Sequence, residues 1–149
     1  MRRGGSRFWD TFFRGSYRLV RAADPVIRAV RRAVPIATIE ELRVTGRSTG
    51  RERAVLVTLL TVDGRTYAGH PNGVRAAWVR NLLTCGDATI VYRDGLRSPV
   101  RATLVAGGPE RAAVIRSTFA QQPIPANLAY WLARRHIEAV GMYFRLEPA

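Results

Sequence analysis

The sequence has no lysine, a single cysteine and only two histidines, and these shortages exclude several classes of protein. One cysteine cannot form an internal disulfide, so nothing implies an oxidising compartment. A Cys/His metal cluster is excluded too, because only His70 and His136 are available to join Cys85. No run of about 18 apolar residues is present, and we therefore expect no transmembrane helix.

Two further absences concern export and catalysis. The N-terminus lacks the uninterrupted apolar segment of a secretory signal, because Arg14, Arg18 and Arg21 interrupt it. We therefore expect a cytoplasmic protein. The acids after residue 40 are scattered, and no catalytic triad or pair of carboxylates is visible. Consequently, the sequence assigns no catalytic residue and no metal ligand.

Arginine, in contrast, is abundant. All 24 basic residues are arginine, and the formal net charge is +13. Residues 1–40 contain nine arginines against three acids, so the positive charge is densest at the N-terminus. Such a charge fits nucleic acid, an anionic membrane surface or an anionic cofactor. The length fits one domain with a sizeable core.

Two amphipathic helices are predicted at the N-terminus, over residues 8–22 and 25–34. Apolar side chains recur in them at three- and four-residue spacing, and the arginines lie mostly on other faces. This make-up suits helices that lie in a membrane interface, and it equally suits helices that pack on their own domain. We treat residues 1–35 as a basic amphipathic helical extension of a domain formed by residues 36–149.

After Pro35 the pattern changes to short strands joined by tight turns. Asp63-Gly64 and Asp94-Gly95 are hairpin signals, and Gly86 is expected to end a helix. We expect strands at 37–45, 54–62, 65–70, 88–93, 96–106 and 139–146, and helices at 75–85, 109–120 and 126–137. This order indicates an α+β fold, namely a mainly antiparallel sheet or small barrel with flanking helices.

The most informative stretch lies between two β-branched runs and reads Thr45-Gly46-Arg47-Ser48-Thr49-Gly50-Arg51-Glu52-Arg53. Its two glycines allow positive φ and a close approach of the backbone to a ligand. Backbone N–H groups in such a turn can form an anion-binding nest, and arginines offer forked donors to phosphate or carboxylate. The stretch is neither a P-loop nor a dinucleotide fingerprint. We interpret it as a turn that holds the anionic part of a ligand, with a hairpin loop of solvated arginines as the alternative.

Together with a second block, this turn resembles a known family. The second block runs from Gly73 through Trp78-Val79-Arg80-Asn81-Leu82. The two blocks are similar to the T-G-R-x-[ST]-G-x-x-R and G-x(n)-W-x-x-N-L patterns of the deazaflavin-dependent nitroreductases and quinone reductases, which use coenzyme F420. The resemblance covers about residues 36–106 and implies a split β-barrel with a cofactor site.

The resemblance also implies which residues form that site. The first block would hold the phosphate and anionic tail of the cofactor, residues 54–57 would run along it, and residues 70–73 and 78–81 would close over it. The implied cofactor-binding residues are Gly46, Arg47, Ser48, Thr49, Gly50, Arg51, Arg53, Ala54, Val55, Leu56, Val57, His70, Pro71, Asn72, Gly73, Trp78, Val79 and Asn81. Ser48 stands where many members have a basic residue, and Arg51 or Arg75 could replace the missing charge.

Several of these assignments have a structural alternative. Trp78 can wall the cofactor or belong to the core, and Asn81 can bond within the pocket or tie down the strand ends. His70 can donate to a ligand or be a surface-loop histidine. Cys85 is expected to be a buried apolar side chain. The late aromatic side chains are candidates either for lining the acceptor pocket or for the core: Tyr130, Trp131 and Tyr143.

The sequence thus predicts an oxidoreductase that transfers a hydride from reduced F420 to a quinone, a nitro compound or a similar electron-poor organic acceptor. A membrane-soluble acceptor would suit a peripheral position on the inner face of the cell membrane, reached through the N-terminus. The alternatives are an FMN-binding enzyme of the same fold and a non-catalytic carrier of cofactor or lipid. A nucleic-acid binder is not expected, since no specific motif is evident. The oligomeric state stays open.

Overall fold

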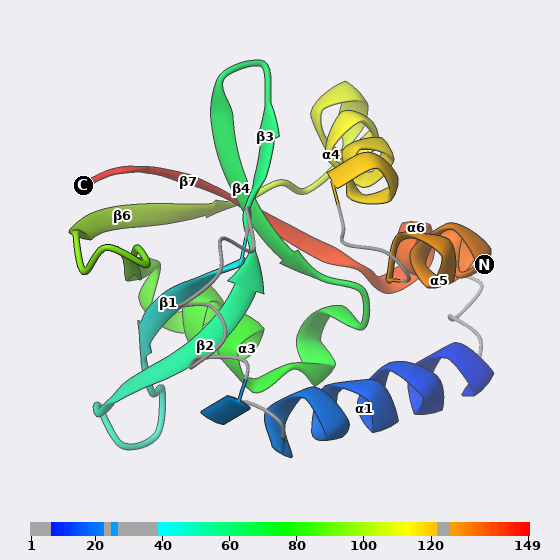
Figure 1. Cartoon of the computed structure of the whole chain (residues 1–149). Coiled ribbons are helices and arrows are strands. Elements are labelled where there is room, and N and C mark those ends of the chain that lie inside the picture. Colours follow the sequence, from blue (N-terminus) through cyan, green and yellow to red (C-terminus); the bar gives the residue numbers. More distant parts are fainter. Residues whose placement is uncertain (1–6, 23–24, 27–38, 122–125) are drawn as a thin grey trace.

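The computed structural model describes residues 7–22, 25–26, 39–121 and 126–149 of the chain (Figure 1). Its strands are β1 (Ile39–Thr45), β2 (Glu52–Thr58), β3 (Leu60–Val62), β4 (Arg65–His70), β5 (Asp87–Val91), β6 (Arg97–Leu104) and β7 (Met142–Pro148). Its helices are α1 (Arg7–Ala22), η1 (Gly73–Arg75), α3 (Ala77–Cys85), α4 (Gly108–Gln121), α5 (Ala126–Leu132) and α6 (Arg134–Val140). The predicted helix over 25–34 lies outside the described residues except for Pro25 and Val26.

All seven strands belong to one curled antiparallel sheet with the order β2-β1-β5-β6-β7-β4-β3 (Figure 1). The hairpin turns form where the sequence predicts them. At the β3–β4 turn, Asp63 and Gly64 both take positive φ, 49° and 75°, as a type I′ turn requires. The predicted α+β fold, a mainly antiparallel sheet with flanking helices, is confirmed.

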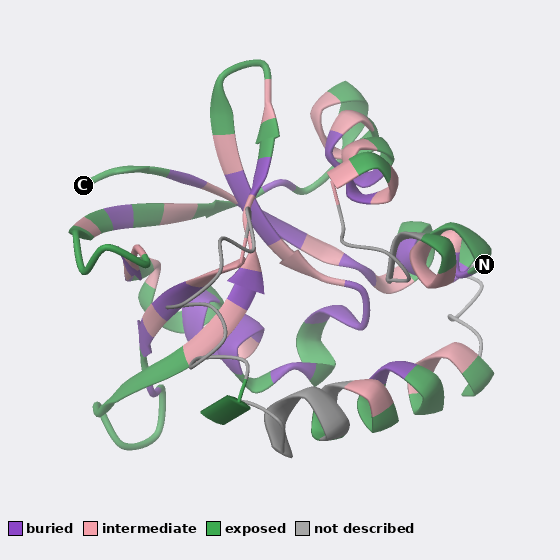
Figure 2. Cartoon of the chain, viewed as in Figure 1, coloured by how far each residue is buried: buried purple, intermediate pink, exposed green. Residues whose placement is uncertain are grey.

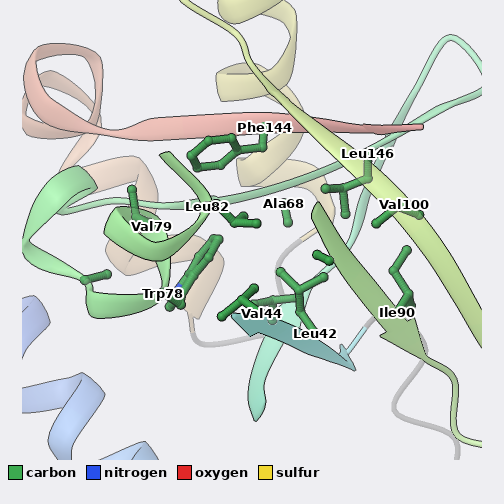
Figure 3. Close-up of a cluster of buried hydrophobic side chains, with 13 residues drawn as sticks. Leu42, Val44, Ala68, Trp78, Val79, Leu82, Ile90, Val100, Phe144 and Leu146 are labelled. Atoms are coloured by element: carbon green, nitrogen blue, oxygen red, sulfur yellow. The ribbon is translucent and has the colours of Figure 1, made fainter. Parts of the chain in front are cut away.

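The first hydrophobic core lies between α3 and the sheet (Figure 3). Buried residues alternate with less buried ones along β5, whereas β1, β4 and β7 each contain two adjacent buried residues (Figure 2). Helix α3 contributes Trp78, Val79 and Leu82, and it ends at Gly86, which has φ 72° and donates its N–H to the Leu82 carbonyl at 2.8 Å. The buried strand residues of this core include Leu42, Val44, Ala68, Ile90, Val100, Phe144 and Leu146.

A second core joins α1, α4 and α6 to the neighbouring strands. Phe13 of α1 is only 6% exposed and contacts Tyr130 and His136, with ring centroids 5.5 and 6.0 Å apart. Helix α4 contributes Val114 and Ile115, which are also buried. The first N-terminal helix therefore packs on the body of the domain, one of the two roles that the sequence left open.

Four predicted boundaries were wrong. The strand expected at 54–62 is two strands, because β2 pairs with β1 and β3 pairs with β4 at opposite ends of the sheet order. The helix expected at 126–137 is also two, with a break at Ala133. Residues 139–140 extend α6 instead of starting β7, since Gly141 ends that helix with an N–H bond to the Ile137 carbonyl at 2.8 Å. The helix expected at 75–85 starts at Ala77, after the separate turn η1.

Candidate functional site

The turn between β1 and β2 is a compact loop closed by its own backbone. The Gly46 N–H donates to the Arg51 carbonyl at 2.8 Å, and the Gly50 N–H donates to the Gly46 carbonyl at 2.8 Å. Gly50 has φ 66°, and a Cβ on Gly46 would lie 2.9 Å from the Thr49 hydroxyl oxygen. Both glycines are thus required by the conformation of the turn.

Asn81 fastens this turn to α3. Its side-chain oxygen accepts hydrogen bonds from the Arg47 backbone N–H at 3.2 Å and from the Arg47 Nη1 at 2.9 Å. Asn81 is 6% exposed and Arg47 is exposed, so both bonds are partly buried. The sequence left open whether Asn81 bonds in the pocket or ties down the strand ends, and the structure shows it anchoring the turn at the cavity wall.

A cavity of about 640 Å³ lies between this turn, the edge strand β2 and α3. Its volume is in the range of small-molecule sites. One part is polar, with the turn backbone and two arginines, and the other part is a largely apolar wall. The lining residues are Val44, Gly46, Arg47, Ser48, Thr49, Glu52, Arg53, Ala54, Val55, Leu56, Ala77, Trp78 and Asn81.

The charges at this cavity favour an anion. Within the described residues, no hydrogen bond or ion pair engages the guanidinium of Arg53. The carboxylate of Glu52 is held by Arg43 at 2.8 Å and by Arg97 at 3.7 Å. The hydrogen bond to Glu52 is the main reason why the pKa of Arg43 is raised. Glu52 is therefore neutralised from outside, while Arg53 keeps its donors for a ligand.

The sequence-derived site residues fall into two groups. Ten of them line the cavity: Gly46, Arg47, Ser48, Thr49, Arg53, Ala54, Val55, Leu56, Trp78 and Asn81. Of the remaining eight, Gly50 and Arg51 are exposed at the tip of the turn, His70 is half-buried, and Val57, Pro71, Asn72, Gly73 and Val79 are buried without contributing to the lining. A role for these eight stays a prediction. Reasoning from sequence missed Val44, Glu52 and Ala77, although Val44 directly precedes the first block and the other two lie within the two blocks.

Trp78 belongs to the core and also lines the cavity, while its role as a wall for the cofactor stays a prediction. Trp78 is 4% exposed within the first core, where its ring packs 6.3 Å from Phe144. It also meets the ring of His70 edge-on at 6.4 Å. Such a rigidly packed indole gives the apolar wall a fixed shape.

His70 is not the surface-loop histidine that was one alternative. It is the last residue of β4 and is half-buried, and its Nδ1 accepts the backbone N–H of Asn72 at 3.1 Å. Burial lowers the pKa of His70 to about 4, so the ring is neutral at pH 7 and offers no positive charge to a phosphate. Cys85 was also predicted wrongly, since it is exposed at the end of α3.

Tyr130 and Tyr143, the candidates for the acceptor pocket, lie in the second core region and do not line the cavity. Tyr143 is 2% exposed, and its ring lies over Gly69, where a Cβ would be 2.2 Å from the ring. Burial is the main reason why the pKa of each tyrosine is raised. The third candidate, Trp131, is half-exposed on α5.

The chemistry available in the cavity is mainly that of binding. Among the residues that the structure describes, no histidine, cysteine, tyrosine or methionine lines the cavity, so these residues offer it no soft metal ligand and no imidazole for proton transfer. In the part of the chain that the structure describes, no three His, Cys, Asp or Glu side chains lie close enough together to hold a metal ion. Within the same residues, no helix is long and apolar enough to cross a membrane.

Comparison with solved structures identifies the fold. HutZ, a heme storage protein from Vibrio cholerae, superposes with a TM-score of 0.57 at 14% identity, over 84% of this chain and 89% of that chain. An F420-H2 dependent reductase, FDR-A, gives 0.57 at 17% identity, over 74% and 95%. A pyridoxamine 5′-phosphate oxidase-related FMN-binding protein from Nostoc punctiforme gives 0.53 at 14% identity, over 87% and 80%.

These neighbours share the curled antiparallel sheet, and the chain therefore has the split β-barrel fold. No protein-family model matches the sequence, and no curated protein matches it. At such low identities the likeness concerns the fold alone. The neighbours with this fold are described as binding heme, F420 or FMN, so the ligand of this chain has to be argued from its own cavity.

Proposed function

We propose that the cavity binds a deazaflavin cofactor, coenzyme F420, and that the protein is an oxidoreductase that reduces a quinone, a nitro compound or a similar electron-poor organic acceptor. The observation that carries the proposal is the division of the cavity into an anion-binding part and an apolar wall. A ligand that fits both parts has a flat apolar ring system and a phosphate-bearing tail.

The residues present fit such a cofactor. Arg47 and Arg53 supply charged donors beside the turn, and Gly46 allows the compact conformation that places them at the cavity. Strand β2 is an edge of the sheet, so its outward backbone groups are available to a ligand that runs along residues 54–56. Val55, Leu56 and Trp78 provide the apolar surface for the rings.

Reduced deazaflavin supplies a hydride when bound. The protein's part is then to hold and orient the cofactor and to exclude water. Arg47 is fixed by Asn81 before any ligand arrives, which lowers the conformational cost of binding an anion. Trp78 is fixed by the core and limits how the rings can tilt. No side chain is assigned to proton transfer.

FMN is the second candidate, because its phosphate and flavin rings make the same demands on the cavity. Heme fits this cavity less well, since its lining offers no histidine, cysteine, tyrosine or methionine to the iron. A carrier that binds F420 without turnover is the non-catalytic alternative.

The test is a titration of the purified protein with F420, FMN and hemin in parallel, followed by fluorescence or absorbance. We expect F420 to bind most tightly, and Arg47→Ala with Arg53→Ala to weaken it at least roughly thirtyfold, because two charge-assisted contacts are lost. Arg93→Ala, an exposed arginine of the β5–β6 hairpin, is the matched control and should bind normally. Unchanged affinity of the double variant would remove the turn from the site.

Turnover separates an enzyme from a carrier. Oxidation of reduced F420 in the presence of a soluble quinone or nitroaromatic compound, abolished by the same double variant, is the expected outcome. Tight binding without turnover across the acceptor series would establish the carrier, and binding of FMN alone would keep the site and change the cofactor.

A further inference from the structure

Helix α1 leaves large aromatic side chains in solvent even though it is docked on the domain. Phe13 is buried, but Phe8 is 66% exposed and Phe12 is 39% exposed. The two exposed rings stack on one another at 6.4 Å, so they form one apolar ridge. Packing on the domain therefore accounts for the buried apolar side chains of α1 but not for its exposed aromatic ones.

Helix α5 continues the exposed apolar surface. Leu128, Trp131 and Leu132 are 60%, 49% and 53% exposed. The two helices are in contact through Phe13 and Tyr130, whose ring centroids lie 5.5 Å apart. Figure 1 shows α5 near the N-terminal end of α1. We call Phe8, Phe12, Leu128, Trp131 and Leu132 the apolar surface of α1 and α5.

Exposed arginines lie on the same part of the molecule, on α1 and α6. Arg7, Arg14 and Arg18 are exposed on α1, and Arg135 is exposed on α6. The Arg134 guanidinium lies 4.5 Å from the centre of the Trp131 ring. The described acids of these three helices are only two: Asp10, which is mostly buried and paired with Arg14 and Arg75, and Glu138.

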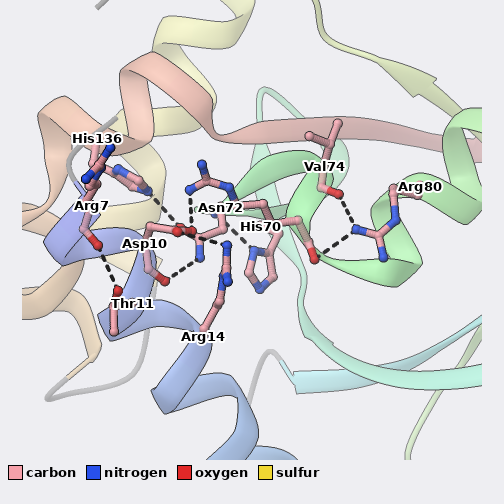
Figure 4. A network of polar contacts seen from close by, with 10 residues as sticks. Arg7, Asp10, Thr11, Arg14, His70, Asn72, Val74, Arg80 and His136 are labelled. Carbon is pink, nitrogen blue, oxygen red and sulfur yellow. Dashed lines mark hydrogen bonds and ion pairs between the residues drawn. The ribbon is translucent and has the colours of Figure 1, made fainter. Parts of the chain in front are cut away.

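A buried polar network holds α1 in place beneath this surface (Figure 4). Asn72, which is 2% exposed, donates from its side chain to the Asp10 carbonyl at 3.1 Å. The Asn72 side-chain oxygen lies 2.8 Å from Nε2 of His136, which is also 2% exposed. The Asp10 carboxylate is in turn paired with Arg14 at 3.0 Å and with Arg75. The helix is therefore anchored before the apolar surface meets any partner.

We propose that the apolar surface of α1 and α5 binds peripherally to an anionic membrane surface. Exposed aromatic and leucine side chains next to arginines are the combination that inserts shallowly at the boundary of headgroups and acyl chains. The arginines add electrostatic attraction to anionic lipids. Because the described helices are too short or too polar to span a bilayer, the binding is to the surface. The proposal needs no cofactor and can fail or succeed separately from the proposed function.

Vesicle sedimentation of the full chain provides the first test. We expect binding to vesicles of phosphatidylglycerol and phosphatidylcholine in equal parts, and little binding to phosphatidylcholine alone. Phe8→Ser with Trp131→Ser should weaken binding at least roughly tenfold. The matched control is Leu83→Ser with Leu96→Ser, which also removes two large exposed apolar side chains (43% and 63% exposed) but from α3 and the β5–β6 hairpin. Equal loss in both variants, or in neither, would overturn the proposal.

A second measurement compares the wild type with Trp131→Phe, a conservative change at an exposed position. Lipids brominated on their acyl chains should quench tryptophan fluorescence, and Trp131→Phe, which keeps the site apolar, should lose most of that quenching while still binding. Undiminished quenching in Trp131→Phe would place the contact elsewhere. Light scattering should give the same mass for the wild type and for Phe8→Ser with Trp131→Ser. If the wild type were a dimer and the double variant a monomer, a second copy of the chain would cover this surface instead.

Discussion

Two buried asparagines nine residues apart hold two different peripheral segments of the molecule. Asn72, 2% exposed, binds α1 and α6, and Asn81, 6% exposed, binds the turn between β1 and β2. The charges around them differ. Near Asn72, Asp10 is paired with Arg14 and Arg75. Near Asn81, no described residue pairs with the guanidinium of Arg53.

This difference separates a structural contact from a binding site. Charges that are satisfied within the fold hold an element in place, whereas cations left without an internal partner beside a cavity can be satisfied by a ligand. Arg51 or Arg75 was expected to replace the basic residue missing at Ser48. Arg75 is paired with Asp10, so we propose Arg51, which is exposed on the turn, for this role.

The largest effect should come from Asn72→Ala. This change removes the bonds to the Asp10 carbonyl and to His136 and leaves buried polar groups without partners, which should lower the free energy of unfolding by about 3 kcal/mol. Asn81→Ala, at a slightly more exposed position, should lower the free energy of unfolding by about half as much. Urea unfolding measures both. A greater loss from Asn81→Ala would contradict the division of roles between the two asparagines.

A change of charge sharpens the comparison at the other asparagine. Asn81→Asp keeps an oxygen acceptor for both Arg47 donors, so the turn should stay in place and the unfolding midpoint should move little. The new carboxylate would repel an anionic ligand, and we expect roughly tenfold weaker F420 binding. If affinity were instead retained, the anionic tail would have to lie away from Arg47.

The sequence predicted the elements that depend on local signals. The hairpin turns at Asp63-Gly64 and Asp94-Gly95, the end of α3 at Gly86, and the antiparallel sheet all formed as expected. Ten of the 18 residues predicted for the cofactor site line one cavity, since both motifs lie at the ends of elements that the sheet brings together. Their contact with a cofactor stays a prediction.

Other features could not be predicted because they depend on tertiary contacts. The break between β2 and β3 reflects pairing with strands at opposite ends of the sheet order. The environment of His70 depends on Trp78, which lies on another element, and the exposure of Cys85 depends on what covers the end of α3. The Asn72 network joins residues 62 and 64 positions apart, which no local pattern shows.

The smallest predicted effect is that of lowering the pH on the free energy of unfolding. It too should distinguish the region around Asn72 from the region around Asn81. Both histidines lie near Asn72, and burial is the main cause that lowers the pKa of each, to about 4 for His70. Asp10 opposes this shift at His136 and Arg75 adds to it. His136 also buries Nδ1 without a hydrogen-bond partner, so protonation would bury an unsatisfied N–H.

Because the folded pKa lies below the unfolded value of about 6.5, this contribution to stability is complete above that pH and is lost as the pH falls toward 4. We expect the free energy of unfolding to drop by about 1 kcal/mol between pH 7.5 and 6 on account of the histidines. Urea unfolding of His70→Gln with His136→Gln should show a flatter pH dependence over this range. An equally steep dependence in that variant would assign the acid sensitivity to carboxylates. The turn at Asn81 includes no histidine, so its anchoring should change little over the same range.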